Sequence, residues 1–233
     1  QRQMCIRDSV SPRSKITYLI ALILGVGIPV GVIYLLELTK FKIEGRADVE
    51  KLTSAPIVGD IPLTDEKQGA IAVFENQNNL MSETFRNIRT NLQFMLNNDQ
   101  KVILVTSTVS GEGKSFVSAN LAISLSLLGK KVVIVGLDIR KPGLNKVFQL
   151  SNKERGITQY LSNPETDLME LVQLSDVNKN LFILPGGTVP PNPTELLARN
   201  GLDRAIETLK KNFDYVILDT APIGMVTDTL LIG

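Results

Sequence analysis

The sequence predicts an α/β fold, a parallel sheet with helices on both faces, preceded by one transmembrane helix. Two observations lead to this prediction. Downstream of Lys101, apolar runs typical of buried strands alternate with segments of helical periodicity, and such alternation is typical of a parallel sheet. Upstream, residues 16–36 are mostly apolar and carry no charge, which makes the run long enough to cross a membrane.

The composition excludes several classes of site. The chain has 233 residues, a net charge of +1 and no histidine. The absence of histidine excludes His-based metal sites, Ser-His-Asp triads and histidine general bases. The single cysteine, Cys5, cannot form a disulfide within one chain. Because the net charge indicates no strong basic field, we expect no nucleic-acid partner.

We expect four segments along the chain. Residues 1–9 have no periodicity and resemble a translated sequencing-adaptor string, so we interpret them as a non-native artefact. A juxtamembrane segment and the transmembrane helix occupy residues 10–38. A cytoplasmic linker with scattered prolines and charges occupies residues 39–78. The α/β domain covers residues 79–233, and we expect it to be truncated at its C-terminus, where an apolar pattern is interrupted.

The apolar run at residues 16–36 predicts a single membrane span. At about 1.5 Å per residue a helix of this length spans roughly 30 Å, the thickness of a bilayer core. A buried core helix and a signal peptide are the alternatives, but the apolar core of a signal peptide is shorter, about 7–15 residues. Positive charges favour a cytoplasmic C-terminal side. Outside residues 1–9, Arg13 and Lys15 precede the run, and Lys40, Lys42, Arg46 and Lys51 follow it.

The α/β domain begins with an amphipathic helix over residues 80–96, whose apolar side chains recur at steps of three and four. Strands are expected where aliphatic residues run together, at residues 101–106, 130–138, 181–187 and 214–222. Helical patterns are found at residues 114–128, 156–162, 167–172, 194–200 and 202–212. The carboxyl ends of the strands therefore share one edge of the sheet, where α/β proteins bind ligands.

The stretch TVSGEGKS predicts a phosphate-binding loop between the first strand and its helix, and therefore a P-loop fold. Gly111 and Gly113 let backbone N–H groups turn toward an anion, and the following helix directs the positive end of its dipole there. Lys114 can reach the β- and γ-phosphates, and the Ser115 hydroxyl can bind Mg²⁺. A chance Gly-Lys-Ser at a helix start is the alternative, which the flanking strand and helix disfavour. The predicted ATP site comprises Ser110, Gly111, Glu112, Gly113, Lys114, Ser115 and Phe116.

Two aspartates are expected at strand ends beside this loop. Asp219 and Asp138 each follow an apolar run. With Ser115 they would surround Mg²⁺, and one of them could accept a proton from an attacking hydroxyl. A residue that only caps the following turn is the alternative for Asp219. We predict Ser115, Asp138 and Asp219 as metal ligands, and Lys114, Asp138 and Asp219 as catalytic residues.

Together, the loop, the segment VGLDIRKP and the segment LDTAP resemble the Walker A, A′ and B motifs of bacterial tyrosine kinases, a family in the MinD/ParA branch of P-loop proteins. The resemblance covers residues 80–233. It includes an E-x-x-R-x-x-R motif at Glu83, Arg86 and Arg89, which in the family packs against a neighbouring kinase domain in a ring. Local ion pairing on an exposed helix face is the alternative. Residues 190–197, PPNPTELL, also resemble a family segment, with a loop capped by Thr194 as the alternative.

The resemblance implies an ATP- and Mg²⁺-dependent protein tyrosine autokinase that regulates capsular or exopolysaccharide synthesis and export. It implies a homo-oligomeric ring, and as partners the polysaccharide export machinery and a tyrosine phosphatase. The apolar helix resembles the last span of polysaccharide co-polymerases of the chain-length-determinant type, which implies the bacterial inner membrane and a cytoplasmic kinase domain. The family's acceptors are C-terminal tyrosines, whereas Tyr160 and Tyr215 are expected to be packing residues.

Three positions depart from the motif patterns. Thr108 stands where phosphate loops usually begin with glycine, and Gly136 where the A′ motif often has its first aspartate. Val109 stands where MinD-type ATPases carry a signature lysine that the tyrosine kinases lack, which argues against a hydrolytic switch. Two alternatives remain: a membrane-tethered MinD/ParA-type ATPase, and a non-catalytic nucleotide-binding co-polymerase subunit, which Gly136 would favour.

Overall fold

The computed structural model describes residues 14–38, 43, 45–63, 69–75, 79–97, 99–163, 165–198 and 200–232. The chain divides into two compact units, Gln1–Pro56 and Ile57–Gly233. The predicted artefact at residues 1–9 lies outside the described residues. So do Arg13, Lys40 and Lys42, on which the predicted membrane orientation partly rests.

The second unit is built around a five-stranded sheet with the strand order β1-β5-β2-β4-β3. Four strands are parallel, namely β1 (Val102–Val105), β5 (Tyr215–Asp219), β2 (Val132–Gly136) and β4 (Leu181–Leu184). The prediction of a parallel sheet is confirmed. β3 (Gln173–Leu174) pairs antiparallel with β4 and is not predicted, because two residues are too few to show the alternation of a strand.

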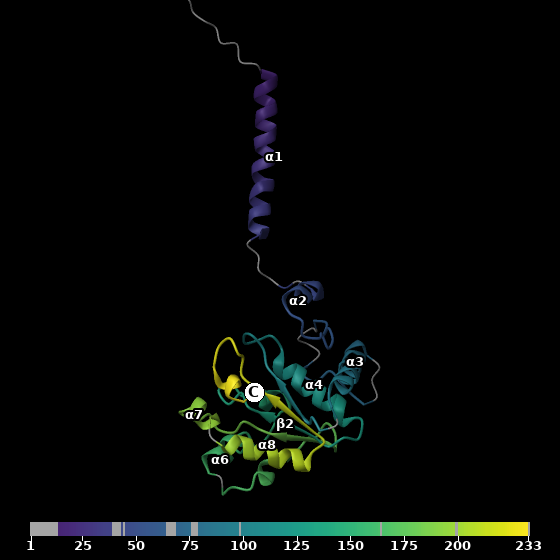
Figure 1. Ribbon diagram of the computed structural model, residues 1–233, viewed down its shortest axis with the longest axis vertical. Helices are drawn as coiled ribbons and strands as arrows, with labels where there is room; N and C mark the ends of the chain where they lie inside the picture. Colours follow the sequence, from purple (N-terminus) through teal and green to yellow (C-terminus); the bar gives the residue numbers. More distant parts are fainter. Residues whose placement is uncertain are drawn as a thin grey trace, which may run out of the picture. The chain divides into compact units, whose positions relative to one another are not determined.

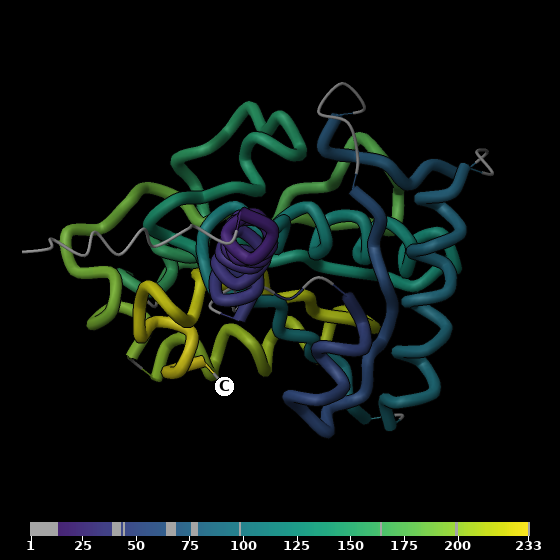
Figure 2. Tube along the Cα trace, turned by 90° about the horizontal axis from the view of Figure 1, so that it is seen from above, coloured from purple at the N-terminus to yellow at the C-terminus, as the bar shows by residue number. Residues whose placement is uncertain are grey.

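Helices cover both faces of this sheet, as Figures 1 and 2 show. α3 (Leu80–Met95) and α4 (Lys114–Ser126) pack on one face, and α6 (Ile157–Ser162) and α8 (Gly201–Asn212) pack on the other. The remaining elements of this unit are short: α5 (Leu144–Val147), η2 (Met169–Leu171), α7 (Pro193–Leu197) and η3 (Asp228–Leu231). The predicted helix at residues 167–172 is therefore a single 3₁₀ turn.

Side chains of the central strands alternate between two apolar cores. In β2, Val133 and Val135 pack into the core with α6 and α8, whereas Val132 and Ile134 pack into the core with α3 and α4. Burial on both faces explains why β2 is a continuous apolar run rather than an alternating one. The sequence also predicts a buried first strand, but β1 is half-buried along its length because it lies at the edge of the sheet among the described strands.

Part of the predicted linker packs onto the α/β domain. The compact unit begins at Ile57, upstream of the predicted domain boundary at residue 79. Asn120 of α4 accepts hydrogen bonds from the backbone N–H groups of Ala72 (2.8 Å) and Val73 (3.1 Å), and it donates one to the Ala70 carbonyl (3.0 Å). The asparagine is fully buried, so it fixes this segment to the helix that follows the phosphate loop.

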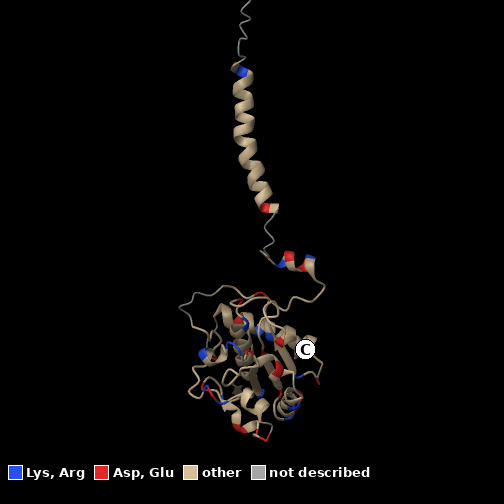
Figure 3. Cartoon of the chain, turned by 90° about the vertical axis from the view of Figure 1, so that its left-hand side faces the viewer, with Lys and Arg blue, Asp and Glu red and all other residues tan. Residues whose placement is uncertain are grey.

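The first unit contains α1 (Ser14–Leu38) and α2 (Arg46–Leu52). α1 has 25 residues and a mean hydropathy of 2.6, and it is the one helix among the described residues that is long and apolar enough to cross a membrane. No α1 residue is buried within the molecule, and in Figure 3 the colours that mark charged residues appear only near the ends of the helix. The predicted apolar helix is therefore present, and its composition is consistent with a membrane anchor.

Candidate functional site

The phosphate loop joins β1 to α4 at the carboxyl edge of the sheet. Gly111 and Gly113 have φ angles of 96° and 91°, which a residue with a side chain rarely adopts. Glu112 closes the loop on itself, since its Oε2 accepts hydrogen bonds from the backbone N–H groups of Thr108 (2.7 Å) and Val109 (3.2 Å). Thr108 is not among the residues with positive φ, so the loop does not require glycine at its first position.

Lys114 and Ser115 begin α4 and turn toward the two predicted aspartates. Lys114 Nζ lies 2.8 Å from Asp138 Oδ2 and 3.9 Å from Asp219 Oδ1. The Ser115 hydroxyl donates to Asp219 Oδ2 at 2.7 Å. The structure therefore brings together all four residues for which the sequence predicts chemistry, although they are far apart along the chain.

Asp219 ends β5 and is 1% exposed. Burial raises the pKa of its carboxyl, while the charge of Lys114 and the hydrogen bond from Ser115 act in the opposite direction. The Ser118 hydroxyl donates to the Lys114 carbonyl at 2.8 Å and also lies 3.3 Å from Asp219 Oδ1, a contact that the sequence did not predict. Its spacing, four residues after Lys114 on the same helix face, is the signal that could have identified it.

Asp138 follows β2 and is also buried. Besides the ion pair with Lys114, its Oδ1 accepts a hydrogen bond from the Lys141 backbone N–H at 3.1 Å, so it caps the turn after the strand as well. Two residues earlier, a Cβ on Gly136 would lie 3.0 Å from the backbone nitrogen of Gly186. The loop after β4 therefore occupies the space into which an aspartate at position 136 would point.

The side chain of Phe116 does not face this site. Its ring packs against Phe85 of α3, with ring centroids 6.0 Å apart and an interplanar angle of 60°. Only the backbone of this residue can contribute to the predicted ATP site. The two domain tyrosines also pack as expected: Tyr160 is buried in the core with α6, and Tyr215 is half-buried in β5.

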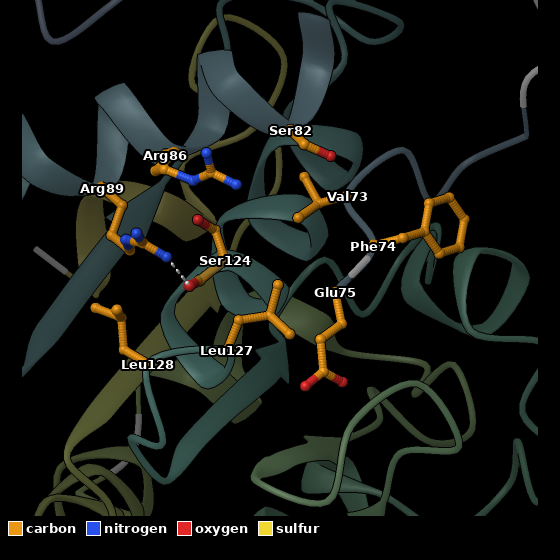
Figure 4. A pocket seen from close by; sticks show the side chains of 9 residues that line it. All are labelled: Val73, Phe74, Glu75, Ser82, Arg86, Arg89, Ser124, Leu127 and Leu128. Carbon is orange, nitrogen blue, oxygen red and sulfur yellow. Dashed lines mark hydrogen bonds between the residues drawn. The ribbon is translucent and has the colours of Figure 1, made fainter. Parts of the chain in front are cut away.

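The residues of the E-x-x-R-x-x-R motif lie on α3, separate from the phosphate loop. Arg86 pairs with Glu83 on the exposed side of the helix, as the local alternative expects. Arg89 is half-buried and donates from Nη1 to the Ser124 carbonyl of α4 at 2.6 Å, and burial lowers its pKa. Figure 4 shows these arginines beside a cavity of about 210 Å³. Its lining residues are Val73, Phe74, Glu75, Ser82, Arg86, Arg89, Ser124, Leu127 and Leu128.

The oxygen atoms at the loop suit Mg²⁺. Mg²⁺ binds through one or two carboxylates, hydroxyls and phosphate oxygens. Ser115, Asp138 and Asp219 supply such donors within contact of Lys114. Over the described part of the chain no group of three or more His, Cys, Asp or Glu side chains could hold a metal, so a bound Mg²⁺ would need ligands from the nucleotide as well.

Comparisons with known proteins agree with this geometry. A family model described as an AAA domain matches residues 100–233. The chain is 40% identical over 151 residues to the tyrosine-protein kinase CpsD of Streptococcus agalactiae, and it spans 65% of the length of that relative. It is 37% identical over 168 residues to the tyrosine-protein kinase YwqD of Bacillus subtilis, covering 72% of this chain and 69% of YwqD.

A solved structure, that of the chimerical protein CapA2B2, matches with a TM-score of 0.72 and 34% sequence identity, over 81% of this chain and 80% of that one. The family model covers more than half of the chain, and the similarity to YwqD extends over more than two thirds of that protein. The chain therefore belongs to the family of bacterial tyrosine-protein kinases.

Proposed function

We propose that this protein is an ATP-dependent protein tyrosine autokinase that regulates capsular or exopolysaccharide synthesis and export. The observation that carries the proposal is the cluster of Lys114, Asp138 and Asp219 at a glycine-bearing loop. CpsD and YwqD, to which the chain is similar, are named tyrosine-protein kinases.

The loop binds the phosphates of ATP. Its backbone N–H groups and the amino end of α4 supply fixed partial positive charge, and Lys114 supplies a full one. To reach the phosphates, Lys114 exchanges the carboxylate of Asp138 for phosphate oxygens. Because the lysine is already at the loop, this exchange requires only a side-chain movement.

Ser115, Asp138 and Asp219 would hold Mg²⁺. When bound, the metal neutralises charge on the β- and γ-phosphate oxygens. Asp219 is the fixed member of this set, because Ser115 and Ser118 both contact its carboxylate. Asp138 is the member whose carboxylate becomes available when Lys114 moves to the phosphates.

Phosphoryl transfer then requires a base for the tyrosine hydroxyl. The bond from the γ-phosphorus to the bridging oxygen breaks, a bond to the tyrosine oxygen forms, ADP leaves, and the hydroxyl proton passes to a carboxylate. Asp138 is better suited to accept it than Asp219, since two hydroxyls contact the Asp219 carboxylate.

Partners and location follow from the same proposal. α1 anchors the protein in the bacterial inner membrane with the kinase domain in the cytoplasm, where ATP is available. Copies assemble into a ring through Glu83, Arg86 and Arg89, and each copy phosphorylates a neighbour. The polysaccharide export machinery and a tyrosine phosphatase act on or with this ring. Arg86 is the motif residue best placed for contact with a neighbour, because Arg89 is half-buried against α4.

Incubation of the full-length protein with labelled ATP, Mg²⁺ and a glutamate–tyrosine copolymer as acceptor tests the proposal. We expect label on tyrosine with the wild-type protein and none with Lys114→Met, while Lys141→Met, which removes an exposed lysine beside the site, keeps activity. Absence of phosphotyrosine from the wild-type reaction would contradict the proposed function.

A further inference from the structure

Three side chains from distant parts of the chain meet beside the candidate site. Arg140 follows Asp138 by two residues, Thr194 lies in α7, and Asp228 begins η3. Figure 1 shows η3, in yellow, next to α7. Arg140 Nε lies 2.7 Å from Asp228 Oδ2, and Arg140 Nη2 lies 3.2 Å from Asp228 Oδ1. The guanidinium therefore binds this carboxylate through two nitrogens.

Thr194 completes the arrangement. Its Oγ1 accepts a hydrogen bond from Arg140 Nη2 at 2.8 Å and donates one to Asp228 Oδ1 at 2.8 Å. The sequence suggests Thr194 as a helix cap, but the cap position of α7 is Asn192, and Thr194 lies inside the helix. The threonine hydroxyl is thus committed to the Arg140–Asp228 pair and not to the helix end.

Burial makes this pair asymmetric. The side chain of Asp228 is 2% exposed, whereas that of Arg140 is 38% exposed. The hydrogen bond from Arg140 lowers the pKa of Asp228, so the carboxylate is charged at neutral pH. Nη1 of Arg140 donates to none of the described residues. The pair therefore presents the positive, donor-bearing edge of a fixed guanidinium to solvent.

The charges of the candidate site favour a further cation beside Lys114 and the proposed Mg²⁺. Lys114 is one positive charge beside two carboxylates, Asp138 and Asp219, and the terminal phosphate of ATP adds further negative charge. Arg140 lies in the same loop as Asp138, and the negative charge of Asp138 acts on the Arg140 guanidinium. A guanidinium binds phosphate through paired N–H groups, and one that is already held loses less entropy on binding.

We propose that Arg140 is a specificity-determining residue that binds the terminal phosphate of the nucleotide, and that Thr194 and Asp228 are positioning residues that hold it. The proposal rests on the proposed nucleotide site. A cross-link that only joins three segments of the fold is the alternative. The two differ in one measurable property, because a structural cross-link does not distinguish ATP from ADP.

Calorimetry of the full-length protein with Mg²⁺ can measure the affinities for ADP and for a non-hydrolysable ATP analogue. In Arg140→Gln we expect the affinity for the analogue to fall roughly tenfold or more, with the affinity for ADP changed less than about twofold. Thr194→Val and Asp228→Asn should likewise lower the ratio of the affinity for the ATP analogue to the affinity for ADP. Thr194→Ser, which keeps the hydroxyl, should have the wild-type ratio. Arg204→Gln, on the exposed side of α8, leaves both affinities unchanged.

Equal losses for both nucleotides in Arg140→Gln, or no loss for either, would overturn the proposal. So would an unchanged affinity for the analogue together with a raised KM for the acceptor, because Arg140 would then bind the acceptor. If Asp228→Asn does not fold, the affinities of Arg140→Gln and Thr194→Val for the two nucleotides are sufficient to test the proposal. A wild-type protein that binds neither nucleotide would instead contradict the proposed function, which keeps the two failures distinguishable.

Discussion

Lys114 Nζ lies 2.8 Å from Asp138 Oδ2, so the cation that the phosphate loop presents is bound to a carboxylate predicted to hold Mg²⁺. Both side chains are largely buried, at 11% and 7% exposure. In such a pair each charge is balanced without a nucleotide. When the nucleotide binds, phosphate would replace Asp138 as the partner of Lys114, and Mg²⁺ would replace Lys114 as the partner of Asp138.

Ser118 is expected to orient Asp219 for the metal. Its hydroxyl lies 3.3 Å from the carboxylate, and loss of such an outer contact typically weakens metal binding about tenfold or more. In Ser118→Ala the Mg²⁺ concentration for half-maximal ATP binding rises accordingly. Ser126→Ala is the matched control, because this buried hydroxyl of the same helix bonds only to the Ile123 carbonyl among the described residues. If Ser118→Ala and Ser126→Ala required the same Mg²⁺ concentration, the proposed role of Ser118 in orienting Asp219 would be contradicted.

Two buried aspartates are expected to give opposite pH dependences of stability. Burial raises the pKa of Asp219 above its ordinary 3.8, so its ionisation destabilises the folded state, increasingly as pH rises through the folded pKa. The bond from Arg140 lowers the pKa of Asp228, so its stabilising contribution is present above 3.8 and is lost as pH falls through the folded pKa.

Denaturant unfolding in metal-free buffer tests both signs. Between about pH 3 and about pH 8, Asp219→Asn should become more stable relative to wild type as pH rises, whereas Asp228→Asn should become less stable. Parallel curves for the two variants would show that at least one of these carboxylates does not have the environment described.

Asn120 is expected to be important for stability. Replacement by alanine leaves the buried N–H groups of Ala72 and Val73 without their acceptor, which should lower the free energy of unfolding by about 2–4 kcal/mol. Asn91→Ala removes an exposed hydrogen bond to the Val58 carbonyl and should cost less than about 1 kcal/mol. Chemical denaturation measures the free energy of unfolding of both variants. Similar losses in the two would mean that the buried hydrogen bonds of Asn120 contribute little to stability.

Gly136 is expected to tolerate no side chain without movement of the loop after β4. A Cβ there would lie 3.0 Å from the Gly186 nitrogen, so Gly136→Ala should lower the free energy of unfolding by about 1–3 kcal/mol. Gly136→Asp, which supplies the aspartate often found in the family, should be at least as destabilised. If Gly136→Ala had the same thermal unfolding midpoint as wild type, the loop after β4 would be able to move without a cost in stability, which would contradict this prediction.

Much of this arrangement could be predicted from the sequence, because it depends on local patterns. The glycines of the loop, the strand before it and the helix after it mark the phosphate site, and parallel strands bring Asp138 and Asp219 to the same edge. The apolar run of α1 is equally local.

What could not be predicted depends on contacts between distant segments. Nothing in the pattern around Thr194 or Asp228 indicates that they meet at Arg140, and the packing of Phe116 against the core follows from its contact with Phe85. The half-burial of β1 likewise follows from its place in the strand order, which single-strand patterns do not contain. Asn120 is a polar residue in an apolar helix, and only the packed segment at residues 70–73 explains it.

The central claim is that the site at Lys114 and Asp138 transfers phosphate to tyrosine and not to water. The direct measurement is the ratio of phosphotyrosine to inorganic phosphate formed per ADP by the full-length protein with a tyrosine-containing acceptor, in wild type and in Asp138→Asn. We predict that phosphotyrosine accounts for most of the ADP in wild type and that Asp138→Asn forms it at least about a hundredfold more slowly. Inorganic phosphate equal to ADP, with no phosphotyrosine, would contradict the claim and identify the protein as an ATPase.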